Sequence, residues 1–351
     1  MLETLENAEH YIFLEYFIIA PGEMWDGILN VLEKKARAGL DVRLIYDDFG
    51  CVSTMPENFS AVLRSKGIRC EAFNPILPLA VALNNNRDHR KIAVIDGYIA
   101  FTGGINLADE YINRKKRFGY WKDTGIKLTG EAVRSFTVMF LELWSVLATE
   151  KIDYNKFDVH AWHPQTFEAK GFVQPYTDSP FDKLPTGESV YMNIINRAKH
   201  YVYIYTPYLI CDNEVLTALC MAADSGVDVR IITPGIPDKK TVFFVTQSYY
   251  DRLVAHGVKI FEYQPGFVHA KCFVCDDEIA AVGTINLDFR GLYLHFECGV
   301  WMYGTDSVAD VKGDFLDTQL KCREITLKEC LEKSAWTRLW QSVLRLFAPL
   351  L

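Results

Sequence analysis

Two copies of one short pattern of chemically competent residues lie in the two halves of the chain, 180 residues apart from His89 to His269. In each copy a histidine is followed at fixed offsets by a lysine, an aspartate and a turn that ends in asparagine. Because every offset is the same in both halves, chance is a poor explanation of the pattern. The repetition predicts one site assembled from two halves. The two copies consist of His89, Lys91, Asp96, Gly104 and Asn106, and of His269, Lys271, Asp276, Thr284 and Asn286.

This set of residues is suited to phosphoryl transfer. Lysine and asparagine side chains can hold and neutralise the oxygens of a phosphodiester, so we place Asn106, Asn286, Gly104 and Thr284 at the phosphate. One imidazole can act as the nucleophile without a metal, while the other acts as general acid and then as general base. The sequence is symmetric about this choice, and we prefer His89 as the nucleophile.

The two motif aspartates and the partners of the histidines need separate predictions. We group Asp96 and Asp276 with the catalytic residues, and the alternative is that they close the turn after a strand and bind a cation. A catalytic histidine also needs a partner on its other ring nitrogen, for which Asp123 and Glu297 are the candidates. No metal or cofactor is expected, because the C-x-x-C pair formed by Cys272 and Cys275 falls in a predicted strand whose positions i and i+3 face opposite sides.

The elements that must position these residues are also repeated. Segments that end a helix and enter an apolar strand, such as 8–14 and 198–204, recur at nearly constant offsets, with helix-like stretches such as 24–38 between the strands. Alternating strands and helices predict an α/β fold of two similar halves, each a mostly parallel or mixed sheet flanked by helices, related by a pseudo-twofold with the site between them. The expected organisation is a first half at 1–150, a connector at 151–188, a second half at 189–330 and a C-terminal amphipathic helix at 331–351.

Composition limits the class of protein. The chain has 351 residues, is 50% hydrophobic and has a formal net charge of −8, which indicates a folded enzyme and argues against nucleic acid as its main partner. Nine cysteines without regular spacing indicate a reducing compartment. No apolar stretch reaches the length of a spanning helix and no leader is recognisable, so we expect a soluble or membrane-associated protein.

The paired motif resembles the phospholipase D superfamily, and the surrounding phrases resemble bacterial cardiolipin synthases over nearly all of the chain. The resemblance implies condensation of two phosphatidylglycerols to cardiolipin and glycerol through a phosphatidyl-histidine, without a metal. Two features depart from the synthases: the hydrophobic N-terminal helices are lacking, which suggests a catalytic portion or a shortened form, and Gly291 stands where serine is expected. The phrases that carry the resemblance are Tyr46-Asp47-Asp48, Asn86-Arg87-Asp88-His89, Gly103-Gly104-Ile105-Asn106, Ala108-Asp109-Glu110-Tyr111, Thr206-Pro207-Tyr208, Gln247-Ser248-Tyr249-Tyr250, Gly266-Phe267-Val268-His269 and Asn286-Leu287-Asp288-Phe289-Arg290.

Two other functions use the same pattern. A phospholipase or nuclease of the superfamily would differ only in whether water or a lipid hydroxyl reaches the phosphoryl-histidine, and the acidic balance makes a nuclease the weaker alternative. A lipid-binding module without activity would be expected if one motif had decayed, and both are intact.

Three stretches suggest access to lipid. They are the apolar insert at 76–83, the basic run at 114–117, and a C-terminal face with Trp336, Leu339, Trp340, Val343, Leu344 and Phe347. Each also has an ordinary interpretation, as a packed loop, a solvated charge run or a helix docked on the core. We expect a peripheral protein at the cytoplasmic face of the cell membrane whose partners are phosphatidylglycerol, cardiolipin and the membrane surface, not nucleic acid. The oligomeric state is left open.

Overall fold

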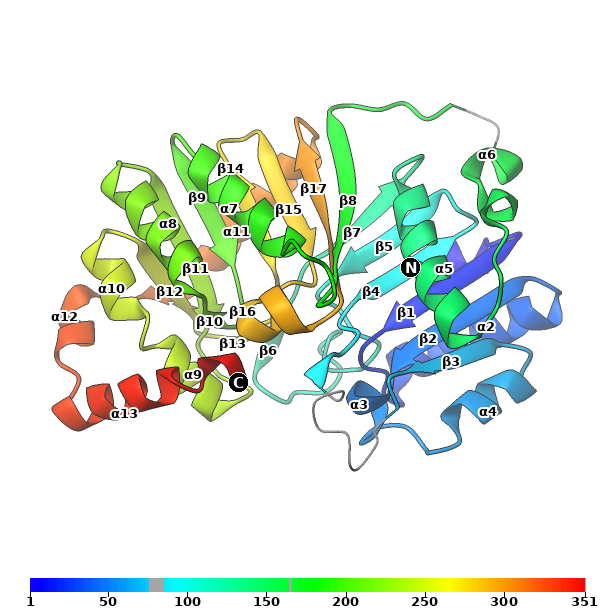
Figure 1. Cartoon of the computed structure of the whole chain (residues 1–351), viewed down its shortest axis with the longest axis horizontal. Coiled ribbons are helices and arrows are strands. Elements are labelled where there is room, and N and C mark those ends of the chain that lie inside the picture. Colours follow the sequence, from blue (N-terminus) through cyan, green and yellow to red (C-terminus); the bar gives the residue numbers. More distant parts are fainter. Residues whose placement is uncertain (76–84, 164–165, 351) are drawn as a thin grey trace.

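Each half of the protein is built on one mixed sheet, and the two halves lie side by side in the computed structural model, which describes residues 1–75, 85–163 and 166–350 (Figure 1). The first sheet has six strands in the order β3-β2-β1-β4-β5-β7. Strands β1, β2 and β3 run parallel, whereas β4, β5 and β7 are antiparallel to their neighbours. The strands are β1 (Tyr11–Tyr16), β2 (Asp41–Asp47), β3 (Arg69–Phe73), β4 (Lys91–Ile95), β5 (Ile99–Gly103) and β7 (Gly125–Thr129).

The second sheet repeats this topology and adds a strand at each edge. Its eight strands have the order β18-β12-β11-β9-β14-β15-β17-β8. The predicted α/β class with two similar halves is confirmed. The sheets are mixed because each motif strand turns back in a hairpin instead of crossing over through a helix. The strands are β8 (Phe172–Asp178), β9 (Tyr201–Tyr205), β11 (Asp228–Pro234), β12 (Lys259–Tyr263), β14 (Cys272–Cys275), β15 (Ile279–Gly283), β17 (Glu297–Tyr303) and β18 (Cys322–Glu324).

Helices cover the sheets with their apolar faces. Trp25, Ile28 and Leu32 of α2 are buried, as the spacing of apolar residues predicts. The stretch predicted at 24–38 is helical from Glu23 to Arg37. The larger helices are α2 (Glu23–Arg37), α4 (Phe59–Ser65), α5 (Val133–Leu147), α7 (Thr186–Arg197), α8 (Asn213–Asp224), α9 (Lys240–Thr246), α10 (Tyr250–Ala255), α11 (Ser307–Gln319) and α13 (Ala335–Arg345), and the shorter ones are α1 (Leu2–Glu6), α3 (Asp48–Cys51), η2 (Tyr154–Phe157), α6 (Val159–Trp162), η3 (Arg290–Leu294), α12 (Leu327–Leu331) and η4 (Ala348–Leu350).

The expected connector at 151–188 contains regular structure. It holds η2 and α6, and then β8, which pairs antiparallel with β17 along the edge of the second sheet. The second half therefore begins structurally near Phe172, before the expected residue 189. Among the described residues, no helix is long and apolar enough to cross a membrane.

Short pairings join the two halves where the motifs lie. Strand β6 (Tyr120–Lys122) of the first half pairs in parallel with β13 (Gly266–Val268) of the second, and an isolated bridge joins Asp88 to Phe296. A single apolar cluster contains Phe13 of the first sheet and Val282 of the second. The halves therefore share a core, and each motif enters the interface beside backbone from the opposite half.

Candidate active site

The backbone of each motif histidine is held by the other half. The His89 N–H donates to the carbonyl of Phe296 over 2.9 Å, and the His269 N–H donates to the carbonyl of Lys122 over 2.7 Å. These two acceptors lie in equivalent segments, 120–123 and 294–297, that run alongside the motifs. The pseudo-twofold predicted from the repeat therefore also relates the supports of the two histidines.

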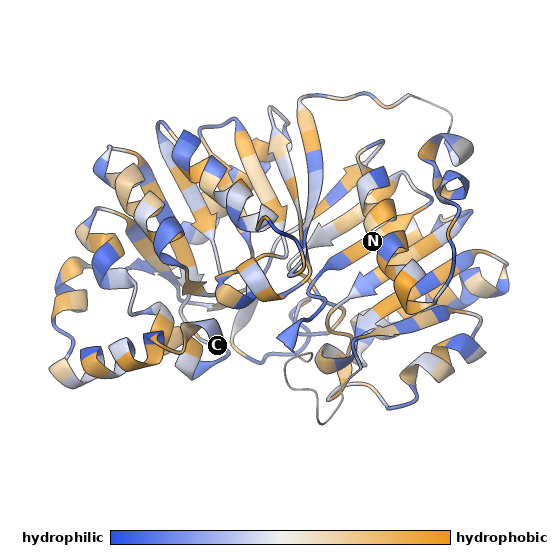
Figure 2. Cartoon of the chain, in the orientation of Figure 1, coloured by the Kyte–Doolittle hydropathy of each residue, from blue (hydrophilic) through white to orange (hydrophobic). Residues whose placement is uncertain are grey.

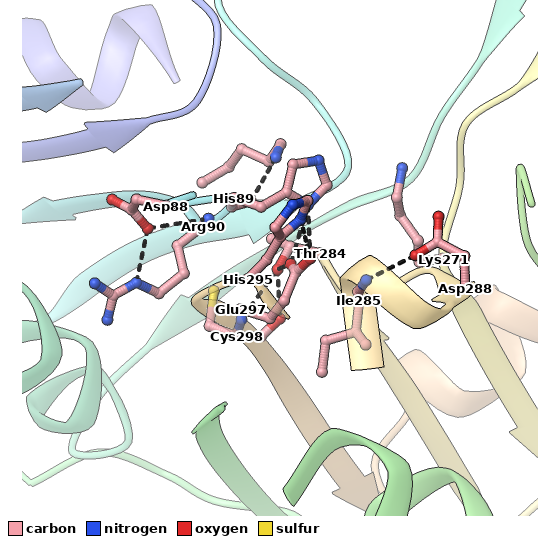
Figure 3. A network of polar contacts seen from close by, with 12 residues as sticks. Asp88, His89, Arg90, Lys271, Thr284, Ile285, Asp288, His295, Glu297 and Cys298 are labelled. Atoms are coloured by element: carbon pink, nitrogen blue, oxygen red, sulfur yellow. Dashed lines mark hydrogen bonds and ion pairs between the residues drawn. The ribbon is translucent and has the colours of Figure 1, made fainter. Parts of the chain in front are cut away.

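Each of these segments ends in the carboxylate that contacts the histidine. His89 Nδ1 lies 2.9 Å from Glu297 Oε1 (Figure 3), and His269 Nδ1 lies 2.8 Å from Asp123 Oδ2. The side chains of Glu297 and Asp123 are 0% and 3% exposed, so the bonds are shielded from water. Both contacts use Nδ1, which leaves Nε2 of each ring available for chemistry.

Gly104 and Thr284 lie behind these carboxylates, away from the position expected for a phosphate. The Thr284 hydroxyl donates to Glu297 (Figure 3). A Cβ at Gly104 would come within 2.0 Å of Asp123 Oδ1, so only glycine lets this carboxylate approach. Neither residue is among those that line the cavity. The prediction that they bind phosphate is therefore corrected: they support the partners of the histidines.

The rings of both histidines line one cavity of about 760 Å³ between the halves. The side chains of Asn106 and Asn286 line it as well. Aromatic rings pack around the imidazoles: Phe17 lies 5.1 Å from His89, and Trp121 lies 5.2 Å from His269, between ring centroids. The remaining lining residues are Ile18, Phe49, Gly50, Asn85, Arg87, Glu110, Tyr111, Arg117, Phe118, Tyr208, Ile210, Asp238, Lys239, Val242, Asp288, Arg290 and His295.

The two motif lysines are buried next to the histidines. Each ammonium group donates to the backbone carbonyl of its own motif histidine. Burial lowers the pKa of Lys91 to about 8 and that of Lys271 to about 7, although Glu297 and Asp123 respectively oppose the shift. Burial thus disfavours the charged form of both lysines, and an anion bound nearby would favour it.

Burial also favours the neutral form of both imidazoles. It lowers the pKa of His269 to about 4, with the Lys271 charge adding to the shift, and it also lowers the pKa of His89 well below its usual range, with the Lys91 charge adding to that shift. The two orienting carboxylates differ. Burial raises the pKa of Glu297. At Asp123 burial acts in the same direction, but His269, Lys271 and the Thr124 N–H together outweigh it, so the pKa is lowered. Phosphate binding would favour protonation of an imidazole, because it adds negative charge among the lysines.

Asp96 and Asp276 lie at the far ends of the motif strands, away from the cavity. Asp96 accepts the backbone N–H groups of Glu9, His10 and Tyr11 over 2.8 to 2.9 Å. Asp276 accepts those of residues 199, 200 and 201 over 2.7 to 3.0 Å. All five residues of strand β4, which spans roughly 16 Å, lie between His89 and Asp96. The assignment of these aspartates to the catalytic set is therefore corrected in favour of the alternative role of closing the turn, and the cation of that alternative is replaced by backbone N–H groups.

Several supporting residues were not identified from the sequence. Asp47 accepts from Arg87 Nε over 3.1 Å and from the Asp88 N–H over 2.9 Å, and so anchors the residues before His89. Asn106 Nδ2 donates to the Tyr111 hydroxyl over 2.7 Å. Asp47 and Tyr111 do occur in the sequence phrases that carry the resemblance, but the sequence alone does not indicate their role.

Gly291 is required by close packing in this chain. A Cβ there would lie 2.7 Å from the backbone oxygen of Asn286, and the Gly291 N–H donates to Asp288 Oδ1 over 2.7 Å. A serine at this position would therefore require the backbone to shift. The departure from the expected serine fits this local structure.

One group of side chains has the spacing of metal ligands. Donor atoms of His89, His295 and Glu297 lie within 4.8 Å of one another. The charges of Lys91 and Lys271 act on His89, and they would repel a cation. We assign no metal to this group.

Comparisons with known proteins agree with this geometry. The family described as "Cardiolipin synthase, PLD-like domain" matches residues 1–144 and 191–318. A cardiolipin synthase of Geobacillus kaustophilus is 38% identical over 99% of this chain and 69% of its own length. An uncharacterized protein of Streptococcus mutans serotype c is 50% identical over the whole chain and 76% of its own length.

Among solved structures, the phosphatidylserine synthase of Haemophilus influenzae Rd KW20 has the same fold. It superposes with a TM-score of 0.72 at 16% identity, covering 99% of this chain and 90% of the other. With two motifs, one shared cavity and matches over nearly the whole length, the chain belongs to the phospholipase D superfamily and to its cardiolipin synthase, PLD-like domain family.

Proposed function

We propose that this protein is a cardiolipin synthase-type phosphatidyltransferase, which condenses two phosphatidylglycerols to cardiolipin and glycerol. The observation that carries the proposal is the single cavity lined by His89 and His269, each with a buried carboxylate on Nδ1. Such a pair supplies a nucleophile and a proton carrier without further groups. The name of the relative in Geobacillus kaustophilus supports the choice of substrate.

In the first half-reaction, Nε2 of one histidine attacks the phosphorus of phosphatidylglycerol. The P–N bond forms, the bond from phosphorus to the glycerol oxygen breaks, and the other imidazolium gives its proton to that oxygen. Lys91, Lys271, Asn106 and Asn286 stabilise the charge on the phosphoryl oxygens. We keep His89 as the proposed nucleophile.

In the second half-reaction, the terminal hydroxyl of another phosphatidylglycerol attacks the phosphatidyl-histidine. The P–O bond forms, the P–N bond breaks, and the imidazole that gave up its proton takes the proton of the hydroxyl. The histidines thereby return to their starting states. Asp123 and Glu297 keep both rings in the orientation that the two steps need.

Hydrolysis of a phospholipid is the alternative, and the walls of the cavity argue against it. Phe17, Phe118, Trp121, Tyr208 and Val242 contribute large apolar surfaces to the lining. Such surfaces favour a lipid over water as the occupant of the cavity. They therefore reduce the access of water to the phosphatidyl-histidine.

The C-terminal helix supports a location at the membrane surface. α13 docks through Gln341, Leu344 and Arg345: Gln341 Nε2 donates to the carbonyl of Phe244 over 3.1 Å, Leu344 packs against the core, and the Arg345 guanidinium lies 4.3 Å from the centre of the Tyr249 ring. Trp336 and Trp340 of its apolar side are 73% and 59% exposed. This side is ready to enter a lipid interface, which suits a peripheral protein at the cytoplasmic face of the membrane.

The other two expected lipid contacts have different outcomes. The insert at 76–83 lies outside the described residues. In the basic run, Arg114 pairs with Glu23 over 3.0 Å and Arg117 lies 3.6 Å from Glu110, so part of its charge is neutralised. We propose the units 1–150, 151–188, 189–330 and 331–351 as the functional division, with β8 added to the second half.

The proposed activity is tested by incubating the purified protein with phosphatidylglycerol vesicles and measuring three products. We expect cardiolipin and glycerol in equal amounts, with little phosphatidic acid. His89→Ala and His269→Ala should each abolish both products, because each removes one of two interdependent groups. The matched control is His256→Ala, which removes an exposed histidine outside the cavity lining. This variant should retain activity.

Phosphatidic acid as the sole lipid product would replace the synthase with a hydrolase. Denaturing the enzyme during turnover of labelled phosphatidylglycerol, and mapping the labelled peptide, identifies the nucleophile. Label on the peptide that contains residue 269 instead of residue 89 would reverse the order of the two histidines.

A further inference from the structure

We propose that the cavity contains a second phosphate subsite, formed by His295, Lys239 and Arg290, beside the site of phosphoryl transfer. The three side chains line the same cavity as His89 and His269. The subsite would take the second phosphate of a two-phosphate lipid. This inference rests on the proposed function, because only a lipid acceptor brings another phosphate into the cavity.

The two halves place different residues beside their catalytic histidines, and His295 is the residue beside His89. It lies two residues before Glu297, as Trp121 lies two residues before Asp123. The ring of Trp121 is 5.2 Å from His269 and the ring of His295 is 5.6 Å from His89, between centroids. The pseudo-twofold thus places an indole, whose N–H donates to Asp123 over 3.2 Å, beside His269. Beside His89 it places a second imidazole, that of His295, and Figure 3 shows this pair.

The imidazole of His295 lacks the partners that a buried polar ring normally has. Both of its ring nitrogens are buried, and neither makes a hydrogen bond within the described parts of the chain. Glu297 Oε1 lies 3.8 Å from Nδ1, beyond hydrogen-bonding distance. A buried polar atom without a partner destabilises the folded protein, so a ligand that supplies an acceptor would be stabilised here.

The charge state of His295 suits an anion. Burial lowers the pKa of His295 to about 3, and the charges of Arg290, Lys91 and Lys239 add to the shift. The ring is therefore neutral at pH 7 and offers one N–H donor. The same cations raise the local potential, so the donor lies in a setting that attracts phosphate.

Lys239 supplies a charge at the start of α9. Its ammonium lies 5.6 Å from the centre of the Tyr208 ring, and no carboxylate pairs with it among residues 1–75, 85–163 and 166–350. The acidic side chains nearby are already engaged. Asp238 accepts from the Tyr208 hydroxyl over 2.6 Å, and Asp288 accepts from the Gly291 N–H over 2.7 Å.

The chemistry of the acceptor explains why two phosphate sites must be neighbours. In phosphatidylglycerol the attacking hydroxyl is separated from its own phosphate by the three carbons of glycerol. When that hydroxyl forms the new P–O bond and releases histidine, its own phosphodiester remains intact and needs a place near the reacting phosphorus. Water and free glycerol carry no such group, so the subsite would select a lipid as acceptor.

The test compares two reactions of the same phosphatidyl-enzyme. Incorporation of labelled glycerol into phosphatidylglycerol needs one phosphate site, whereas cardiolipin formation needs both. For Lys239→Met and His295→Phe we expect the ratio of cardiolipin formation to glycerol exchange to fall by roughly tenfold, as for loss of one charge-assisted contact. The matched control is Lys240→Met, which removes the same charge from the next residue, outside the cavity lining, and should leave the ratio unchanged.

A binding measurement separates this proposal from the proposed function. Glycerol 1,3-bisphosphate should bind the wild-type protein more tightly than glycerol 1-phosphate in calorimetry, and Lys239→Met should remove most of the difference. Equal affinities in the wild type, or an unchanged ratio of activities in both variants, would overturn the subsite. Glycerol exchange without any cardiolipin in the wild type would instead overturn the synthase while the calorimetry still tests the subsite.

Discussion

At the scale of single residues, the same residue types occur in unlike surroundings. Asp123 and Glu297 occupy equivalent positions, yet the pKa of Asp123 is lowered by His269 and that of Glu297 is raised by burial. Thr284 donates to Glu297, whereas Gly104 brings no hydroxyl to Asp123. The two histidines are therefore oriented by carboxylates in different environments, although the sequence motifs around them match, which gives them a physical basis for separate roles.

The buried lysines predict the pH dependence of the enzyme. The pKa of Lys271 is about 7, so this side chain carries its charge below that pH and loses it above. Because the charged form attracts the phosphodiester, kcat/KM should fall as pH rises through about 7 to 8. We expect kcat to fall only at a higher pH than kcat/KM does, because a bound phosphate raises the pKa of Lys271.

This pH profile is measured in neutral detergent micelles, so that the charge of the lipid surface does not change with pH. Lys271→Arg keeps its charge throughout the range and should lose the basic limb, even if its overall rate is low. A wild-type profile of kcat/KM that stays flat to pH 9 would contradict the prediction.

At the scale of elements, the motif strand and its turn form one unit. β14 (Cys272–Cys275) begins shortly after His269 and ends directly before Asp276, whose carboxylate accepts the three N–H groups before and at the start of β9. Asp276 and Asp277 have φ values of 51° and 59°, which asparagine and aspartate tolerate better than most residues. The motif aspartate thus fixes the strand that presents the histidine without touching the substrate.

This role predicts an effect on stability from Asp276→Asn. The amide tolerates the same backbone but is a weaker acceptor than the carboxylate, so the free energy of unfolding should fall by roughly 1–2 kcal/mol in urea denaturation. Activity per folded molecule should be almost unchanged. Glu278→Ala, on the exposed part of the same hairpin, is the control. A large loss of kcat with normal stability would return Asp276 to the chemistry.

The sequence predicted the elements and the histidine pair because both depend on local patterns that occur twice. The partners Glu297 and Asp123 were also proposed from the sequence, and the structure places both at hydrogen-bonding distance. The positions of Asp96 and Gly104 could not be derived in this way. Their contacts depend on which distant backbone or side chain folds against them. The spacing of residues along the chain does not show which distant segment that will be.

At the scale of the whole molecule, the first half of α13 exposes its apolar residues, whereas Leu344 in its second half packs against the core. Trp336, Leu339 and Trp340 are 73%, 52% and 59% exposed, whereas Gln341 is buried against α9. In Figure 2, apolar and polar residues alternate along this helix. α9 in turn carries Val242 into the cavity lining, so a lipid surface that covers α13 would lie close to the site.

Replacing the three exposed side chains should therefore weaken membrane binding more than folding. We expect Trp336→Ser, Leu339→Ser and Trp340→Ser together to lower sedimentation with phosphatidylglycerol vesicles by roughly tenfold or more, with an unchanged unfolding midpoint. Val146→Ser in α5 and Leu320→Ser directly after α11 are the control, because these apolar residues are at least as exposed. Undiminished sedimentation of the triple variant would remove α13 from the membrane contact.

The crossed support of the histidines has a consequence for the origin of the chain. Neither half holds its own imidazole: the ring from one half is hydrogen-bonded to a carboxylate from the other, in both directions. In an interface between two identical subunits related by a twofold axis, each contact likewise occurs twice, once in each direction. An ancestor with one motif would thus have been competent only as a symmetric pair, and gene fusion would then have let one copy of the site diverge, as His295 and Trp121 have done.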